Sequence, residues 1–477
     1  MAEEGDRKEP AGVQKCPTGI SGLDEITGGG LPRGRPTLVC GGAGSGKTLM
    51  ATEFIVRGIT EFGEPGAMMT FEETGDELAD NVASLGMDLQ GLIEQNKLAI
   101  DYVHIDRQEI EETGEYDLEG LFVRLAAIID AVGAKRVVLD TVEALFAALP
   151  NEGLIRAELR RLFRWLKSKK VTAVITGEKG ENTLTRHGLE EYVSDCVIFL
   201  DHRIDRQVAT RRLRIVKYRG SLHGTNEYPT LIGADGLSIL PISSLGLTYP
   251  VTTERVSTGV ETLDAMLSGG GYYRGSSVLV SGSAGTGKSS LSAAFADGIC
   301  RRGEKCLYCS FEESPQQIIR NMASIGIHLA QWQEKGLLKF YNMRPTEQGL
   351  EAHLVQLHKM VEDVNPAAAV IDPLTSLTSI GERDQIKAML TRLIDYLKNH
   401  KITTIYTNLN PSGGSVEKTE AMISSLMDTW VVLRNIETNG DRQRLLHVLK
   451  SRGMAHSSRV RQFLLTDHGI EMPEQTA

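Results

Sequence analysis

The sequence predicts an α/β protein built from two tandem copies of one phosphate-binding domain. GGAGSGKT at 41–48 returns as GSAGTGKS at 282–289, and both fit the phosphate-loop pattern G-x-x-x-x-G-K-[ST]. The flanking segments return in the same order, beginning with TGISGLD at 18–24 and TGVETLD at 258–264. The other matched pairs are GGGLPRG (28–34) with GGGYYRG (269–275), TFEE (70–73) with SFEE (310–313), VVLD (137–140) with AVID (369–372), and KYRGSLH (217–223) with KSRGMAH (450–456).

Length and composition agree with two globular domains. The chain has 477 residues, which exceeds one ordinary core, with 41% hydrophobic and 24% charged residues. The net charge is −10 and no basic tract stands out, so we expect no nucleic-acid partner, although a local patch can hide in an acidic average. The charged start MAEEGDRKEP is not a secretory signal, and no apolar run reaches the roughly 18 residues that span a bilayer. We therefore expect a cytoplasmic protein without a membrane partner.

Cysteine usage points the same way. Six cysteines are scattered along the chain, and Cys306 and Cys309 form its one C-x-x-C pair, within KCLYCSF. That stretch is typical of a buried strand, and no second pair follows to complete a metal site. We predict reduced core thiols.

The repeat sets the expected domain limits. We predict a flexible N-terminus at 1–14, a first domain at 15–247, a second domain at 248–470 and a short tail at 471–477. The polar, Pro-containing stretch SSLGLTYPVTTER marks the boundary between the two domains.

Strand and helix patterns alternate within each copy. In the first copy the apolar run 35–41 precedes the Gly-rich loop, the amphipathic stretch 47–63 follows as a helix, and 65–71, 135–140 and 171–176 are further strands. Strands separated by helices indicate a mostly parallel sheet with right-handed crossovers. Each copy ends in two runs typical of antiparallel hairpin strands, VIFLDHR with TRRLRIVKYRG and VVLRNIE with RLLHVLKSRG.

The two Gly-rich loops are the strongest chemical signal. Their glycines let backbone N–H groups curl around phosphates, while the lysine reaches the β and γ oxygens. A chance Gly-rich turn is the alternative, and two hits in register within a duplication argue against it. The residues predicted to bind a nucleoside triphosphate, ATP or GTP, are Gly41, Gly42, Ala43, Gly44, Ser45, Gly46, Lys47 and Thr48, with Gly282, Ser283, Ala284, Gly285, Thr286, Gly287, Lys288 and Ser289.

A carboxylate follows an apolar strand in each copy. Asp140 and Asp372 would sit at the carboxyl end of the sheet beside the loop, where they would help the hydroxyls of Thr48 and Ser289 to hold Mg²⁺. The alternative is a helix N-cap.

Paired glutamates follow the second strand of each copy. Glu72–Glu73 and Glu312–Glu313 end at the edge that faces the γ-phosphate in phosphate-loop folds. A carboxylate there polarises an attacking water or accepts a hydroxyl proton. The alternative is a pair of solvated loop acids.

The K-x-R-G-x-x-H segments lie far in sequence from their own loops. Lys217, Arg219, Lys450 and Arg452 are therefore candidates for cationic contacts that a neighbouring subunit supplies to the γ-phosphate, as in ring ATPases. The alternative is a solvated hairpin end. We expect the histidine that closes each segment to be structural.

The copies differ most just before these segments. Glu191–Tyr192 in the first copy stands opposite Ser424–Ser425 in the second, and Arg186 stands opposite Thr419. A hydroxyl cluster is a possible phosphoacceptor, and phosphorylation would add about −2 charge. From spacing alone an ordinary polar turn is the better interpretation.

Taken together, these motifs resemble the KaiC family of circadian-clock ATPases and autokinases, remote relatives of RecA-like ATPases. The resemblance covers residues 15–472 and implies two tandem RecA-like P-loop domains in a double-ring homohexamer, with Mg²⁺ and with ATP bound between neighbours. It further implies that the first ring hydrolyses ATP and that the second phosphorylates a neighbour's hydroxyls reversibly.

The resemblance also assigns roles to residues. It makes Ser424 and Ser425 the phosphoacceptors, which replaces the polar-turn interpretation. It places hydrolysis at Glu72 and Glu73 and the kinase base at Glu312 and Glu313. The contacts that it assigns in trans to ATP are Lys217, Arg219, Lys450, Arg452 and Arg156.

Two departures from the family pattern limit this transfer. The acceptor pair is Ser-Ser where clock members carry Ser-Thr, which puts ordered two-step phosphorylation in doubt. The sequence stops at DHGIEMPEQTA, short of the tail that KaiA engages, so we expect a KaiA-independent protein that is phosphorylated by default. Binding of a KaiB-like partner to the first ring stays open.

Two other functions compete with this one. A RecA-like DNA-dependent ATPase predicts stimulation by single strands and steep salt dependence, and the acidic chain shows no basic strip interleaved with aromatics. A nucleotide-gated signalling scaffold without kinase activity keeps both loops, so only an assay separates it from an autokinase.

Overall fold

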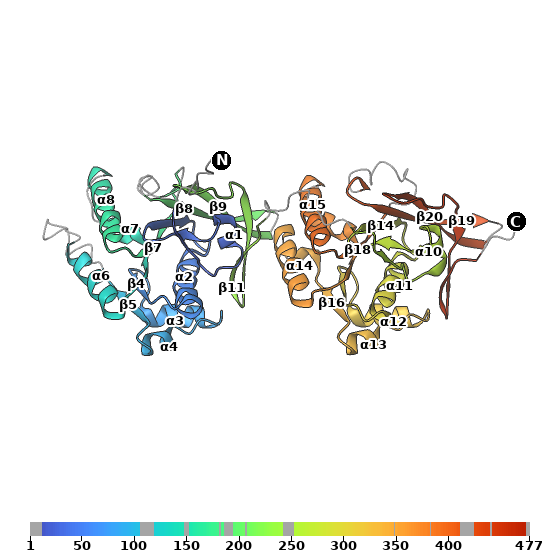
Figure 1. The fold of residues 1–477 in the computed structure, drawn as a ribbon, viewed down its shortest axis with the longest axis horizontal. Helices are drawn as coiled ribbons and strands as arrows, with labels where there is room; N and C mark the ends of the chain where they lie inside the picture. Colours follow the sequence, from blue (N-terminus) through green and yellow to red (C-terminus); the bar gives the residue numbers. More distant parts are fainter. Residues whose placement is uncertain are drawn as a thin grey trace, which may run out of the picture. The chain divides into compact units, whose positions relative to one another are not determined.

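The computed structural model divides the chain into two compact units, Met1–Ser243 and Ser244–Ala477. Each unit is built on one large twisted β-sheet with helices on both faces (Figure 1), and the pairs β1-β2, β12-β13 and β22-β23 form small separate sheets. The structure describes residues 12–104, 119–146, 152–180, 183–185, 194–205, 208–241, 252–347, 349–381, 383–410, 424–438 and 441–473.

The first unit contains a nine-stranded sheet in the order β11-β10-β9-β8-β3-β7-β6-β4-β5. Strands β8, β3, β7, β6, β4 and β5 pair in parallel, whereas β9, β10 and β11 are added antiparallel at one edge. Its elements are β1 (Lys15–Cys16), α1 (Leu23–Thr27), β2 (Leu31–Pro32), β3 (Pro36–Gly41), α2 (Lys47–Phe62), β4 (Gly66–Thr70), α3 (Gly75–Ala83), α4 (Leu89–Glu94), β5 (Leu98–Tyr102), α6 (Glu119–Val132), β6 (Arg136–Asp140), α7 (Val142–Phe146), α8 (Glu152–Ser168), β7 (Thr172–Glu178), β8 (Cys196–Asp205), β9 (Val208–Tyr218), β10 (Glu227–Gly233) and β11 (Gly236–Ile239).

The second unit repeats this plan with eight strands in the order β16-β15-β17-β18-β14-β19-β20-β21. The pairs from β16 to β19 are parallel, and β20 and β21 are antiparallel additions. Its elements are β12 (Arg255–Val256), α10 (Glu261–Met266), β13 (Tyr272–Tyr273), β14 (Ser277–Gly282), α11 (Lys288–Arg301), β15 (Cys306–Ser310), α12 (Pro315–Ala323), α13 (Ala330–Glu334), β16 (Leu338–Asn342), η1 (Pro345–Glu347), α14 (Leu350–Val364), β17 (Ala368–Asp372), η2 (Leu374–Ser379), α15 (Arg383–Asn399), β18 (Thr403–Leu409), β19 (Thr429–Thr438), β20 (Asp441–Ser451), β21 (Arg461–Gln462), β22 (Leu464–Thr466) and β23 (Gly469–Glu471).

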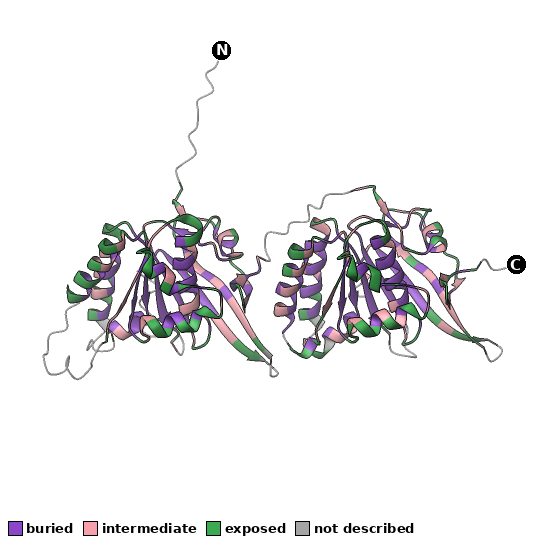
Figure 2. Cartoon of the chain, turned by 90° about the horizontal axis from the view of Figure 1, so that it is seen from below, coloured by how far each residue is buried: buried purple, intermediate pink, exposed green. Residues whose placement is uncertain are grey.

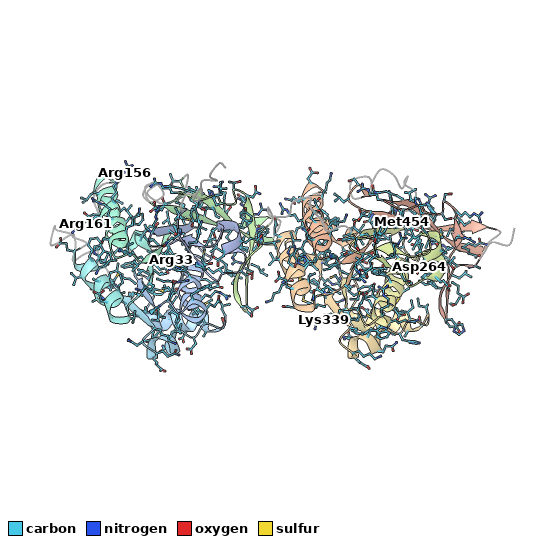
Figure 3. The ribbon with its side chains drawn as sticks, viewed as in Figure 1. Arg33, Arg156, Arg161, Asp264, Lys339 and Met454 are labelled. Atoms are coloured by element: carbon cyan, nitrogen blue, oxygen red, sulfur yellow. The ribbon has the colours of Figure 1, made fainter. Side chains whose placement is uncertain are left out.

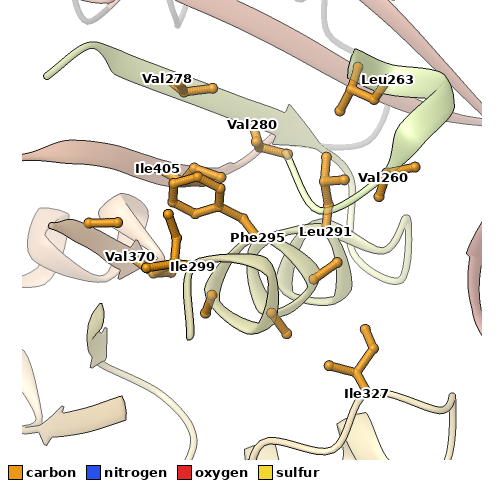
Figure 4. Close-up of a cluster of buried hydrophobic side chains, with 14 of the residues drawn as sticks. Val260, Leu263, Val278, Val280, Leu291, Phe295, Ile299, Ile327, Val370 and Ile405 are labelled. Carbon is orange, nitrogen blue, oxygen red and sulfur yellow. The ribbon is translucent and has the colours of Figure 1, made fainter. Parts of the chain in front are cut away.

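The central strands are buried on both faces, as parallel strands covered by helices must be (Figure 2). Along β3, Leu38 and Cys40 join the core under α6 and α8, while Val39 joins the core under α2. In the second unit, strands β14, β17 and β18 face α11 in the same way. The residues that meet there include Val278, Val280, Val370 and Ile405 with Leu291, Phe295 and Ile299 (Figure 4).

Local signals fix where the flanking helices begin. Thr74 caps α3 and Ser314 caps α12, and each forms a reciprocal capping box with the side chain three residues later. Both helices follow directly after the paired glutamates, so these caps fix the backbone on which the glutamates stand.

The predicted fold class is confirmed. Two mostly parallel sheets flanked by helices follow the predicted order, and both predicted hairpins are antiparallel pairs, β8 with β9 and β19 with β20. Cys306 and Cys309 are buried free thiols in β15, as predicted. Within the described residues, no helix is long and apolar enough to cross a membrane.

Candidate functional site

Each Gly-rich loop joins the end of a central strand to the start of a helix. A Cβ on Gly41 would lie 2.4 Å from the Leu200 carbonyl oxygen, and one on Gly282 would lie 2.5 Å from that of Leu433. The last loop glycine has a φ of 98° in the first copy (Gly46) and 97° in the second (Gly287), a backbone conformation that residues with a side chain rarely adopt. The loop path therefore requires glycine at the same places in both copies.

The loop lysines point into the curl of their own loops. The Lys47 Nζ donates to the Gly42 carbonyl at 3.1 Å, and the Lys288 Nζ donates to the carbonyls of Gly282 and Ser283, each at 2.9 Å. Burial lowers the pKa of Lys288, against the pull of nearby carboxylates. Phosphate oxygens are the anions that would compete for these ammonium groups.

The strand-end aspartates lie beside the loops. Asp140 is buried at the end of β6 and accepts a hydrogen bond from Thr176. Burial raises the pKa of Asp140, while hydrogen bonds from Thr176 and Thr48 oppose that rise. Asp372 is placed alike and accepts from Thr407 and, at 3.1 Å, from the Tyr308 hydroxyl.

In the first copy the Asp140 carboxylate and the Thr48 hydroxyl lie together beside the loop. This pair suits a hard cation such as Mg²⁺, which takes one or two protein oxygens and completes its coordination shell with water and phosphate. Among the residues that the structure covers, no cluster of three or more His, Cys, Asp or Glu side chains forms a richer metal site. The donor set therefore fits a cation that arrives with phosphate.

The paired glutamates face the same edge of each sheet. Glu72 accepts a hydrogen bond of 3.0 Å from Thr141, next to Asp140, and Glu312 accepts one of 2.7 Å from Ser376. In the second copy, partial burial and repulsion from Asp372 and Glu312 raise the pKa of Glu313. A carboxyl with a raised pKa is better suited to take up a proton.

The second K-x-R segment meets the candidate phosphoacceptors. The Lys450 Nζ donates to the Ser424 carbonyl at 2.7 Å, and the Arg452 guanidinium donates to the Ser425 carbonyl at 2.8 Å. Ser425 is exposed and Ser424 is half-buried. The antiparallel pairing of β19 with β20 brings these residues together across 26 and 27 positions of sequence.

This cluster lies at the far end of the sheet from the loop of the same domain. The Asp428 N–H donates to the Ser277 carbonyl at 2.9 Å, and Ser277 begins the strand whose other end, Gly282, opens the loop. Six residues of parallel strand separate the two places by roughly 17 Å at about 3.3 Å per residue. The first domain has the same arrangement. The Arg219 N–H donates to the Asp195 carbonyl at 2.9 Å, next to Cys196, which pairs with Thr37 near the start of β3.

An aspartate pairs with a lysine at this far end in both copies. In the first domain Asp195 pairs with Lys167 at 2.5 Å and lies 4.0 Å from Arg219. In the second domain Asp428 pairs with Lys398 at 2.7 Å and accepts from Ser277. The predicted counterparts Arg186, Glu191, Tyr192 and Thr419 lie outside the described residues.

Sequence reasoning missed one pair of loop contacts. The Arg211 guanidinium donates to the Gly44 carbonyl at 3.2 Å, and Arg444 donates to Gly285 at 3.3 Å. Both arginines stand six residues before the lysine of the K-x-R segment, and this shared spacing was the signal that could have revealed them. The hairpin therefore contacts its own loop with one cation and presents others at the opposite end.

The TGIxxLD motif has a structural role. The Asp24 carboxylate accepts from the Thr18 N–H at 2.8 Å, and Asp264 accepts from the Thr258 N–H at 2.7 Å. Arg156 is an exposed residue of α8, five residues before Arg161 on the same helix (Figure 3). The structure thus places Arg156 on a different element from the hairpin cations.

Comparison with known proteins identifies the family. A family model described as "ATPase: KaiC" matches residues 16–244 and 256–477. The chain belongs to the KaiC family. Similar KaiC-family proteins include "Circadian clock protein KaiC2" of Synechocystis sp. (strain ATCC 27184 / PCC 6803 / Kazusa), 54% identical over 98% of this chain and 83% of that relative.

More distant relatives carry the same family name. "Circadian clock oscillator protein KaiC" of Parathermosynechococcus lividus is 38% identical over 98% of this chain and 87% of its own length. The protein of that name from Prochlorococcus marinus (strain MIT 9313) is 36% identical over 97% and 93%. The resemblance read from the motifs is confirmed, and this protein is a KaiC-family ATPase with two nucleotide-binding domains.

Proposed function

We propose that this KaiC-family chain hydrolyses ATP in its first domain and phosphorylates Ser424 or Ser425 of another copy with its second. One observation carries the proposal. Ser424 and Ser425 lie beside two cations at one end of β14, and the phosphate loop occupies the other end, roughly 17 Å away at 3.3 Å per strand residue. A loop cannot reach the serines of its own domain, so a neighbouring copy supplies the donor.

The same geometry supports self-association. Lys217 and Arg219 in the first domain, and Lys450 and Arg452 in the second, also lie at the end remote from their own loops. They would act on the γ-phosphate held by a neighbour, where a positive charge stabilises the transferring group. A closed ring satisfies this head-to-tail arrangement without leaving a free end, and six copies are the proposed number.

In the second domain each residue has a part in the transfer. Lys288 would bind the β and γ oxygens, and Ser289 with Asp372 would hold Mg²⁺, which when bound neutralises phosphate charge. Glu312 or Glu313 would accept the serine proton as the serine Oγ forms its bond to phosphorus. The bond to the β-phosphate oxygen breaks, and ADP leaves.

In the first domain the acceptor is water. Lys47 would hold the phosphates, Thr48 and Asp140 would hold Mg²⁺, and Glu72 or Glu73 would orient the water. The Thr141 hydroxyl fixes Glu72 at 3.0 Å, which supports Glu72 as the better placed of the two glutamates.

Mixing two inactive variants tests transfer between copies. One chain carries Lys288→Ala and keeps its serines, and the other carries Ser424→Ala with Ser425→Ala and keeps its loop. With radioactive ATP, the mixture should label only the Lys288→Ala chain, identified by a size tag. Failure to label while differently tagged chains co-purify, with the wild type labelled, would contradict transfer between copies.

A second experiment separates the two domains. Glu312→Gln with Glu313→Gln should abolish phosphate incorporation while ADP formation by the first domain continues. Wild-type protein that hydrolyses ATP and leaves both serines unmodified, by phosphopeptide mass spectrometry, would favour the scaffold function. Stimulation of ATP hydrolysis by single-stranded DNA would favour the RecA-like DNA-dependent ATPase.

A further inference from the structure

Three cations contact the segment that runs from Ser424 to Asp428 in their own chain. Lys450 and Arg452 bind the carbonyls of Ser424 and Ser425, and Lys398 approaches the same segment through Asp428 at 2.7 Å. All three come from rigid elements or their ends, β20 and α15. Their positions are therefore set by the fold.

The cations differ in what they bind. Lys398 pairs with the Asp428 carboxylate, whereas Lys450 and Arg452 donate to backbone carbonyls, which carry no formal charge. Burial and the charges of Arg452 and Lys398 lower the pKa of Lys450, while Asp428 opposes that shift. The cations are thus close enough to repel one another, and a phosphoserine carries about −1.5 to −2 at pH 7.

The first domain carries an equivalent aspartate with cations around it. Asp195 pairs with Lys167 at 2.5 Å and lies 3.8 Å from Arg35 and 4.0 Å from Arg219. In the second domain Asp428 pairs with Lys398 at 2.7 Å and also accepts a hydrogen bond from the Ser277 hydroxyl.

We propose that Lys398, Lys450 and Arg452 form a phosphoserine-binding site that retains the phosphate once Ser424 or Ser425 of the same chain is modified. The inference rests on the acceptor role proposed above for these serines. The phosphate would draw Lys450 and Arg452 from the backbone carbonyls, because a dianion is the stronger acceptor for a charge-assisted hydrogen bond. The same cations then act twice: toward a neighbour's ATP before transfer and toward the product afterwards.

The test requires no kinase activity. Phosphoserine is installed at position 425 of the full chain during translation, and its second pKa is measured by phosphorus NMR without nucleotide. We expect that pKa to lie at least about half a unit below the ordinary value near 6, because nearby cations favour the dianion. In Arg452→Gln it should return toward 6, whereas Arg459→Gln, an exposed arginine on the following loop, should leave it unchanged.

The outcomes are separable from those of the proposed function. An unshifted pKa in the otherwise wild-type chain, or the same shift in Arg452→Gln, would overturn the retention site. Lys450→Gln provides a second variant if Arg452→Gln does not fold, and it should also reduce the shift. A lowered pKa in protein that never labels itself with ATP would support the site and contradict the autokinase.

Discussion

A histidine buried between two helices of the second domain should make that domain sensitive to acid. His358 on α14 is 8% exposed and stacks on Tyr396 of α15 with ring centroids 3.5 Å apart. Its Nε2 has no hydrogen-bond partner among the residues that the structure describes. Burial, aided by the charge of His400, lowers the pKa of His358 to about 3.

The direction follows from proton binding. An unfolded histidine titrates near 6.5, so between about pH 6.5 and 3 the unfolded chain binds a proton at this position that the folded chain does not. Stability is therefore lost as the pH falls through that window. At pH 5, which is 1.5 units below the unfolded pKa, the loss is about 2 kcal/mol at 1.36 kcal/mol per unit.

Urea unfolding at pH 7.5 and pH 5 would measure this loss. The chain has three tryptophans, Trp165 in the first domain and Trp332 and Trp430 in the second, so a Trp165→Phe background makes fluorescence report the second domain. His358→Leu removes the titrating ring while keeping an apolar side chain there. Between pH 7.5 and pH 5, the urea midpoint of the protein with His358 should fall by roughly 1 M more than the midpoint of His358→Leu, for an m-value near 2 kcal/mol/M. Parallel shifts in the two proteins would refute the reasoning.

Three other predictions follow from packing. Gly287→Ala should abolish nucleotide binding to the second domain in an equilibrium assay, because the new Cβ would lie 2.5 Å from the Phe463 ring. Gly285→Ala is the control, because its Cβ would meet no atom within 4 Å. It should bind nucleotide more tightly than Gly287→Ala, although Gly285 also has a positive φ. Arg136→Met should lower the unfolding free energy of the first domain by about 3 kcal/mol in urea titrations, because it removes three hydrogen bonds that the fully buried guanidinium donates to the Glu64 carboxylate and to the Phe54 and Pro17 carbonyls. No change would contradict this. Trp430→Phe should cost about 1 kcal/mol by the same measurement through loss of its 2.8 Å bond to Ser281, and a neutral result would mean that the bond contributes nothing.

The sequence was most informative where chemistry demands particular residues at fixed spacing. The loops around Lys47 and Lys288 were evident because their path excludes any side chain at Gly41 and Gly282. The alternation of strands with helices and the antiparallel hairpins followed from apolar runs and from the duplication, whereas the order of the strands within each sheet came only from the structure.

Contacts between segments distant in sequence were not predictable in the same way. The sequence identified the serines and the K-x-R cations as two separate sets of candidates. Their spacing did not predict that Lys450 and Arg452 bind the Ser424 and Ser425 carbonyls. That contact depends on the register of β19 against β20, which shifts between Trp430 and Val431. A single irregularity in pairing changes which side chains meet, and composition carries no record of it.

The six-residue length of β14 has a kinetic consequence. If donor and acceptor stay at opposite ends of one short strand, no concentration of ATP lets a solitary chain mark itself. Labelling per chain would then rise with total protein and fade on dilution, with a reaction order above one until assembly saturates. Self-phosphorylation in such a molecule requires at least two copies. Its extent would therefore depend on the concentration of the protein as well as on the concentration of ATP.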